Sequence, residues 1–306
     1  MTCAWISAAP SKILRMRASQ RIRDTGNSSL MEIVTSDLPR FVGDGYNTRA
    51  MTHLNFTCNV CGTEVTECPI DIIDREVSSC SKCRSTVRFR SIVHLLSMAL
   101  FFRTIPLPLF PRARTIVGLG MSDWAGYADR LAEKFSYTNT YFHQPPFLDI
   151  SAPVAERART CDFVISSEVF EHVAPPVGRA FSHAFDLLKP GGYLILTVPF
   201  SNAPATTEHF PDLHDYRIIQ FGEDYVLVNK TKDGRYSLYD KLCFHGGPGT
   251  TLEMRIFCRQ DLIKHLTDAG FTDVKVFGGD VPQWGILHKH PWSLPILARR
   301  PKGVNS

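Results

Sequence analysis

The chain of 306 residues lacks any long apolar run. Its longest apolar stretches are the size of a strand, whereas a membrane helix needs roughly 20 consecutive apolar residues, so we expect no transmembrane span. The N-terminus also lacks the continuous apolar core of a secretory signal. We therefore expect a cytoplasmic protein, although the Arg-rich, acid-poor stretch before Asp24 would equally suit a mitochondrial presequence or a basic tail.

A strong charge of one sign is also absent. Lys and Arg number 34, Asp and Glu number 30, and the formal net charge is +4. A surplus this small does not by itself indicate a nucleic-acid partner. Residues 1–50 also lack sustained helical or strand periodicity, and we predict a disordered lead-in there.

Cysteine, in contrast, is present in an informative arrangement. Four of the nine cysteines stand in two C-x2-C pairs with eighteen residues between the pairs: Cys58, Cys61, Cys80 and Cys83. Four thiolates at this spacing can converge on one tetrahedral Zn²⁺. We predict a small N-terminal zinc ribbon with four cysteine ligands and a following helix over residues 51–105, and the alternative is a set of unrelated free cysteines.

A stretch with three prolines precedes a long region, residues 112–300, in which apolar strands alternate with amphipathic helices. This alternation predicts an α/β domain with a doubly wound, mostly parallel sheet and helices on both faces. Between about residues 205 and 250 the helical period disappears, and alternating residues flank a KDGR turn. We predict an inserted β cap there.

The segment TIVGLGMSDW places Gly118 and Gly120 after a short buried strand and before a helix. In a doubly wound sheet this is where the backbone approaches a nucleotide-like cofactor, although a plain strand-to-helix turn would use glycine too. A dinucleotide is not favoured, because a third glycine is missing, with Asp123 in its place, and the stretch after the next strand carries no carboxylate.

The stretches FLDIS, CDFVISSEVFEHV and LLKPGGYLILTVP make the chain resemble the class I S-adenosylmethionine-dependent methyltransferases. The resemblance implies a Rossmann-like seven-stranded sheet and S-adenosylmethionine as cofactor. It places Gly118 and Gly120 against the methionyl part, Asp149 at the adenine, and Ser166 and Glu168 along the cofactor's edge.

Two acids of that family pattern are missing here. Ile116 stands where the acid at the end of the first strand is usual, so Ser122 or Asp123 is expected to take its role. The ribose-binding carboxylate after the second strand is also absent, and Asn139, Thr140 or His143 could supply hydrogen bonds instead.

The stretches GLGMSDW, YTNTYFHQPPFLDI, HFPDLHDYR and FHGGPGTTLEMRIF look like a branch of these enzymes that has a zinc ribbon in front and is associated with bacterial polysaccharide biosynthesis. This resemblance implies O-methylation of a sugar, a glycan precursor or another small molecule. The reaction class transfers more safely than the substrate does.

Methyl transfer to a hydroxyl is helped by a nearby base, and histidine is the usual choice. We predict His172, His245 and His209 as catalytic candidates, with a capping or supporting role as the alternative for His172. The polar loops around the insert suggest His214, Tyr216, Glu253 and Arg255 as substrate-binding candidates. Glu168, Glu171 and His172 could instead bind a divalent cation.

Two other functions remain open from the sequence. Arg84, Arg88 and Arg90 follow the second cysteine pair and could grip RNA, which would make the protein an RNA methyltransferase. The missing acids could also mark a non-catalytic interaction protein with a decayed site. The intact GLG, LDI and KPGG stretches favour an active enzyme with a small-molecule or glycan acceptor.

Overall fold

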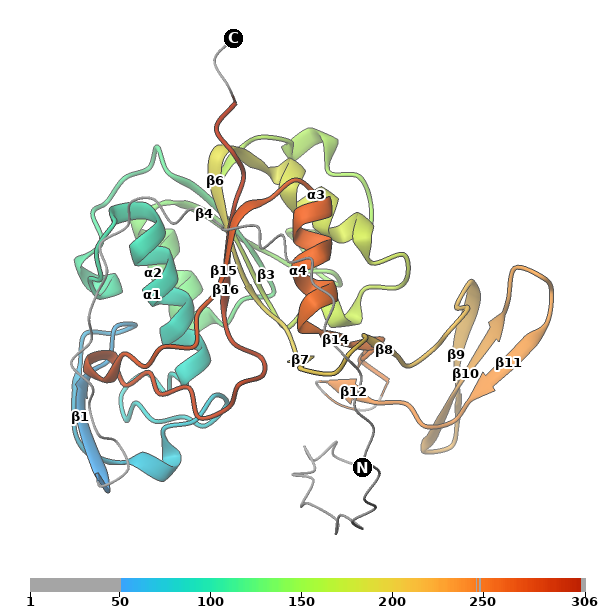
Figure 1. Cartoon of the computed structure of the whole chain (residues 1–306), viewed down its shortest axis with the longest axis horizontal. Helices are drawn as coiled ribbons and strands as arrows, with labels where there is room; N and C mark the ends of the chain where they lie inside the picture. Colours follow the sequence, from blue (N-terminus) through green and yellow to red (C-terminus); the bar gives the residue numbers. More distant parts are fainter. Residues whose placement is uncertain (1–50, 246, 248, 304–306) are drawn as a thin grey trace, which may run out of the picture. The chain divides into compact units, whose positions relative to one another are not determined.

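A mixed sheet forms the centre of the computed structural model, which describes residues 51–245, 247 and 249–303 (Figure 1). The predicted lead-in, residues 1–50, lies outside the described residues. The strand order is β4-β3-β5-β6-β16-β15. The four parallel strands are β3 (Val117–Met121), β4 (Ser136–Thr140), β5 (Cys161–Ser167) and β6 (Leu188–Thr197). The antiparallel edge consists of β16 (Ile296–Arg299) and β15 (Thr272–Val276).

The prediction of seven strands is wrong, because the described residues form six in this sheet. The chain between β4 and β5 contains Pro145 and Pro146, which lack the N–H that a ladder requires. The bridge between Tyr141 and Phe147 lies within this connection and outside the strands of the sheet. The KPGG stretch, residues 189–192, lies inside β6 as an irregularity, and Gly191 adopts φ 86° there.

Helices cover both faces of the sheet, as the alternation predicts (Figure 1). One face packs against α1 (Val87–Phe101) and α2 (Ala125–Lys134), and the other against α3 (Gly178–Leu187) and α4 (Arg259–Asp268). Successive side chains of a strand point to opposite faces, so Phe163 enters the first core and Val164 the second. Both faces of β5 are therefore buried, which explains its continuous apolar sequence.

The cysteine-bearing segment, residues 51–105, shares the first of these cores. Its hairpin of β1 (His53–Thr57) and β2 (Glu64–Pro69) contributes Phe56, which lies in one cluster with Phe163 of the sheet. The fully buried Arg90 donates hydrogen bonds to Ser79 Oγ and to the carbonyl of Gly285. The shared core attaches the segment to the face of the sheet, and the Gly285 contact joins it to the connection between β15 and β16.

The region of the predicted insert, residues 205–250, and its flanks contain strands in three small sheets. In one small sheet, β14 (Arg255–Cys258) pairs in parallel with β7 (Phe200–Ser201) and antiparallel with β8 (Thr207–Glu208). A second sheet is antiparallel and comprises β9 (Asp215–Phe221), β10 (Asp224–Lys230) and β11 (Tyr236–Tyr239). The last pair is β12 (Phe244–His245) with β13 (Thr251–Leu252). Phe210, Leu227, Leu252 and Met254 form a core of their own beneath these strands.

None of the helices in residues 51–245, 247 and 249–303 combines the length and the apolar character needed to cross a bilayer.

Candidate active site

A cavity of about 770 Å³ lies where the carboxyl ends of the parallel strands meet the insert. Met121 ends β3 and Ser122 follows it, Tyr141 follows β4, and Glu168 follows β5. This edge is where open α/β sheets bind their ligands, because the strand-to-helix connections diverge there. The volume falls within the range of roughly 300–1,000 Å³ that is typical of cofactor and substrate sites.

Eight of the residues predicted from the sequence line this cavity: Ser122, Thr140, His143, Asp149, Glu168, His172, Tyr216 and His245. They come from separate stretches of the chain, and the insert contributes Tyr216 and His245. The cavity therefore joins the end of the sheet predicted to hold a cofactor to the insert predicted to hold an acceptor.

Gly118 and Gly120 do not line the cavity. Both lie inside β3, where a β-carbon on Gly118 would be 2.2 Å from the Phe163 ring and one on Gly120 would be 2.0 Å from Tyr137 Oη. The glycines thus make room for two rings that stack with centroids 5.9 Å apart. The turn begins at Ser122, the first residue after β3, which adopts φ 56° and lines the cavity.

Asp123 and Asn139 shape this turn from behind. The Asn139 side chain accepts a hydrogen bond from the Asp123 N–H and donates one to the Asp123 carbonyl, both at 2.9 Å. The Asp123 carboxyl points into the core and accepts a hydrogen bond from Tyr137 Oη. Burial raises the pKa of Asp123 to about 7 despite that bond. Neither residue lines the cavity, so their part is to hold the Ser122 turn, and the buried Ser166 also lies off it.

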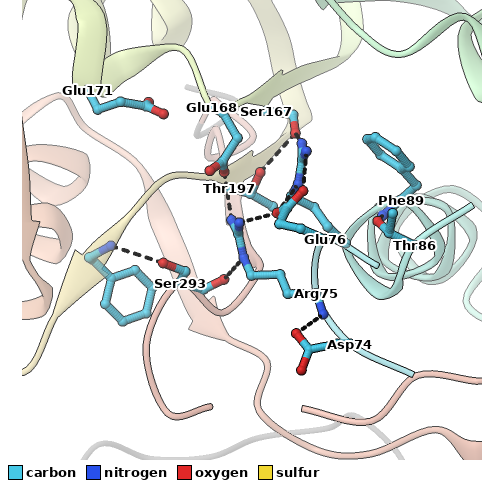
Figure 2. Close-up of polar contacts among 12 residues, drawn as sticks. Asp74, Arg75, Glu76, Thr86, Phe89, Ser167, Glu168, Glu171, Thr197 and Ser293 are labelled. Atoms are coloured by element: carbon cyan, nitrogen blue, oxygen red, sulfur yellow. Dashed lines mark hydrogen bonds and ion pairs between the residues drawn. The ribbon is translucent and has the colours of Figure 1, made fainter. Parts of the chain in front are cut away.

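Glu168 is paired with an arginine from the cysteine-bearing segment. Arg75 Nη2 lies 2.7 Å from Glu168 Oε1 (Figure 2). Arg88 Nη1 donates to the hydroxyl of Ser167 at 2.5 Å. Burial acts to raise the pKa of Glu168, but the charges of Arg75 and Arg88 outweigh it and lower the pKa below its ordinary value. Sequence reasoning missed Arg75, which belongs to no motif and meets Glu168 only through the fold.

A second charged group lies where the insert meets the cavity. Glu253 contacts two histidines, with Oε1 2.9 Å from His209 Nε2 and Oε2 3.0 Å from His245 Nε2. Burial acts to raise the pKa of Glu253, but these two hydrogen bonds outweigh it and lower the pKa to about 2. The hydrogen bond to Glu253 raises the pKa of His245. The rings of His245 and His172 meet edge to face, with centroids 4.8 Å apart.

Two of the predicted substrate-binding residues point elsewhere. Arg255 is fully buried and donates to the carbonyls of Phe170 and Val173 and to the Glu208 carboxylate. It therefore stabilises the short 3-10 turn Phe170–His172 and does not line the cavity. His214 is exposed, and its backbone N–H donates to Asn229.

The arginines considered for RNA binding are mostly engaged within the protein. Arg90 is buried, and Arg88 contacts Glu76 and Ser167, so of the three only Arg84 is exposed. This arrangement does not form a basic surface of the kind that binds a phosphate backbone.

The four paired cysteines converge on one point. Cys58 Sγ lies 3.6 Å from Cys83 Sγ, and Cys61 Sγ lies 3.8 Å from Cys80 Sγ. All four sulfur atoms lie within 4.8 Å of one another.

The sheet and the cavity at its carboxyl edge define an α/β enzyme of the kind that binds a nucleoside-type cofactor. A family model described as a methyltransferase domain matches residues 43–276, well over half of the chain. The chain belongs to this family of methyltransferase domains. The alternative of a non-catalytic protein is therefore not retained.

Solved structures with a similar fold include the CurJ carbon methyltransferase, at 14% identity and a TM-score of 0.42, covering 71% of this chain and 56% of that one. The chain thus spans little more than half the length of that structure. CalS10, an amino pentose methyltransferase from Micromonospora echinaspora, matches at 12% identity and a TM-score of 0.40, covering 71% and 92%. The Burkholderia thailandensis 1,6-didemethyltoxoflavin N1-methyltransferase matches at 17% identity and a TM-score of 0.36, and the match covers 62% of this chain and 72% of that one. No curated protein matches the chain.

Proposed function

We propose that the protein transfers a methyl group from S-adenosylmethionine to a hydroxyl of a small acceptor, of which a sugar or a glycan precursor is the favoured kind. The observation that carries the proposal is the cavity itself. One side is built from the strand ends, with Ser122, Asp149 and Glu168, and the other from the insert, with Tyr216 and His245. A single cavity of about 770 Å³ therefore has a cofactor side and an acceptor side.

The cofactor side suits a sulfonium nucleoside. Ser122 lines the cavity at the turn after β3, and Asp149 is an exposed carboxylate that can accept a hydrogen bond from an adenine amino group. Glu168 stays ionised beside Arg75 and offers a negative charge near a cationic ligand. The ribose hydroxyls would lie near Tyr141 and His143, since the side chain of Asn139 is occupied by the Asp123 backbone.

When bound, S-adenosylmethionine supplies a methyl group activated by the sulfonium charge. A C–O bond forms to the acceptor, the S–CH₃ bond breaks, S-adenosylhomocysteine leaves, and the hydroxyl proton passes to water or to a histidine at the cavity. The protein's task is to place the hydroxyl in line with the methyl carbon and to exclude competing water. Tyr216, Leu252 and Met254 provide a largely apolar wall for this purpose.

We also propose that the four paired cysteines hold a structural Zn²⁺. Four sulfurs at about 2.3 Å from one ion lie about 3.8 Å apart in a tetrahedron. The Cys58–Cys83 and Cys61–Cys80 separations of 3.6 and 3.8 Å agree with this geometry. Because four protein ligands would close the site, zinc there would stabilise the segment and take no part in catalysis.

The test combines binding and turnover. The full chain is titrated with S-adenosylmethionine by calorimetry and then incubated with methyl-labelled cofactor and a panel of nucleotide sugars, free glycans and transfer RNA. Label recovered in a sugar product supports the proposal, label recovered only in RNA overturns the acceptor, and absence of cofactor binding overturns the function.

Matched tyrosine variants locate the acceptor side. Tyr216→Ala removes a side chain that lines the cavity, whereas Tyr236→Ala removes one that is 67% exposed on β11. We expect the first to raise the acceptor KM by about tenfold, an effect typical of losing a buried aromatic contact, without changing cofactor affinity. The second should change neither, and equal effects of both variants would contradict this placement.

A further inference from the structure

Glu171 is a buried carboxyl with no partner to satisfy it. Its side chain is fully enclosed, and neither carboxylate oxygen has a hydrogen-bond partner among the described residues. His172 Nε2 lies 3.6 Å from Glu171 Oε1, which is too long for a hydrogen bond. Figure 2 shows the contrast with Glu168, since a dashed line joins Glu168 to Arg75 and none connects Glu171 to the residues drawn.

An unsatisfied buried carboxyl is costly and usually signals a missing ligand, proton or ion. Position 171 lies in the 3-10 turn Phe170–His172, which the buried Arg255 holds by donating to the Phe170 carbonyl. The orientation of the turn is therefore set by the fold. The unpaired oxygens lie beside the two histidines that line the cavity.

Both neighbouring histidines are arranged as metal-ligating histidines are. His172 Nδ1 lies 2.9 Å from the Leu252 carbonyl, which can only accept, so Nδ1 carries the hydrogen and Nε2 keeps its lone pair. His245 Nε2 contacts the Glu253 carboxylate at 3.0 Å, which leaves Nδ1 as its other nitrogen. A histidine that ligates a metal typically donates its second N–H to a carbonyl or a carboxylate, as these two do.

The ligand atoms of Glu171, His172 and His245 all lie within 4.8 Å of one another. Atoms bound to one ion at about 2.0–2.2 Å are separated by at most about 4 Å, so small side-chain rotations would bring the three onto a common centre. A second possible set, Cys243, His245 and Glu253, is less suitable. The Glu253 carboxylate already contacts two histidines at hydrogen-bond distance, whereas neither Glu171 oxygen has a hydrogen-bond partner among the described residues.

We propose that Glu171, His172 and His245 bind one divalent transition-metal ion at the wall of the cavity, apart from the four paired cysteines. Two imidazoles and one carboxylate favour ions such as Mn²⁺, Fe²⁺, Co²⁺ or Zn²⁺ over Ca²⁺ and Mg²⁺. The sequence hypothesis of a cation at Glu168, Glu171 and His172 is thereby altered. The Glu168 carboxylate is already bound by Arg75. His245 from the insert therefore replaces Glu168 as the third ligand.

The role of the ion rests on the proposed function. Three protein ligands leave coordination positions open, and His172 and His245 face the cavity in which the acceptor would lie. An acceptor with adjacent hydroxyl groups, as in a sugar, could occupy these positions with its oxygen atoms. The ion would then select such acceptors and orient one hydroxyl toward the methyl group.

The test is a Mn²⁺ titration of the full chain, followed by the electron paramagnetic resonance signal of free Mn²⁺. Mn²⁺ prefers nitrogen and oxygen donors to thiolates, so the paired cysteines should not contribute. We expect one saturable site in the wild type. Glu171→Gln and, independently, the half-buried His245→Asn should each weaken binding by at least about tenfold.

Asp123→Asn is the matched control, because it also removes a buried carboxyl but one that lies off the cavity. It should leave Mn²⁺ affinity unchanged. A wild type without a saturable site, or ligand variants that bind as tightly as the wild type, would overturn the proposal in favour of a neutral Glu171 carboxyl. Calorimetry with S-adenosylmethionine on the same samples separates the two proposals, since Mn²⁺ binding is measured without cofactor or acceptor.

Discussion

Arg75 Nη2 lies 2.7 Å from Glu168 Oε1, an ion pair between residues 93 positions apart in the sequence. Arg75 belongs to the cysteine-bearing segment, and Glu168 lines the cavity at the end of β5. Their side chains are only 13% and 20% exposed, so the pair is largely shielded from water. The cysteine-bearing segment thus determines the charge environment of a residue in the methyltransferase cavity.

Arg75→Met should therefore affect both stability and cofactor binding. Removing one partner leaves a shielded carboxylate unpaired, which typically costs about 3 kcal/mol. We expect the free energy of unfolding in urea to fall by about that amount and S-adenosylmethionine affinity to fall with it. Arg75→Lys should recover part of both losses. Arg235→Met, which breaks the exposed pair with Asp233, is the control and should change stability by less than about 1 kcal/mol.

The buried Asp123 predicts a specific pH dependence of stability. Its pKa is about 7 in the folded protein against an ordinary value of 3.8, so the folded state holds the proton more tightly. The contribution of Asp123 to the free energy of unfolding is largest below pH 3.8, decreases as the pH rises toward 7, and is constant above pH 7. A difference of about three pKa units corresponds to roughly 4 kcal/mol as an upper bound.

This dependence is measured as the unfolding free energy of the wild type minus that of Asp123→Asn, between about pH 4 and pH 8. Subtraction removes the other titrating groups, which are common to both proteins. The difference should decrease with rising pH by up to about 4 kcal/mol. A difference that does not change with pH would show that the carboxyl is ionised throughout.

Cys80→Ser should release the zinc that we propose at the four paired cysteines. We expect loss of one equivalent of zinc by elemental analysis and a lower unfolding temperature, since binding energy at a structural site contributes directly to folding. Cys68→Ser is the matched control, because Cys68 is buried in the same segment but outside the cluster. Its zinc content should be unchanged. A wild-type protein that contains no zinc and is as stable as a zinc-loaded sample would contradict the proposed zinc site.

Gly118→Ala tests the position of the glycines. The added β-carbon would meet the Phe163 ring at 2.2 Å, a distance that packed atoms cannot adopt. Overpacking of this kind costs about 1–3 kcal/mol, so thermal unfolding should shift downward even in the absence of cofactor. Gly279→Ala, where nothing lies within 4 Å, should leave stability nearly unchanged. A stable Gly118→Ala protein that lost only cofactor binding would place the glycine at the cofactor after all.

The local elements were predictable because their signals are local. The apolar stretch CDFVISS forms β5, Cys161–Ser167, and the amphipathic stretch 259–271 contains α4, whose end is followed by Gly270 at φ 100°. Apolar periodicity reports which side of an element is buried, and this requires no knowledge of the partner. The cysteine spacing likewise indicated the four thiols that the structure brings together.

The directions of individual side chains depended on packing and could not be predicted in the same way. Asp123 and Arg255 belong to polar stretches that read as ligand-binding, yet both turn into the core and satisfy neighbouring backbone or tyrosine groups. Ser122 takes the turn that Gly118 and Gly120 were expected to form, because Phe163 and Tyr137 occupy the space over the glycines.

The sequence by itself determined the reaction class and the fold, because both depend on patterns of neighbouring residues. Only the tertiary structure decided the composition of the cavity wall. Arg75 meets Glu168 across 93 residues, and His245 from the insert meets Glu171 and His172. Contacts at such separations arise from the packing of whole elements, and no local spacing in the chain encodes them.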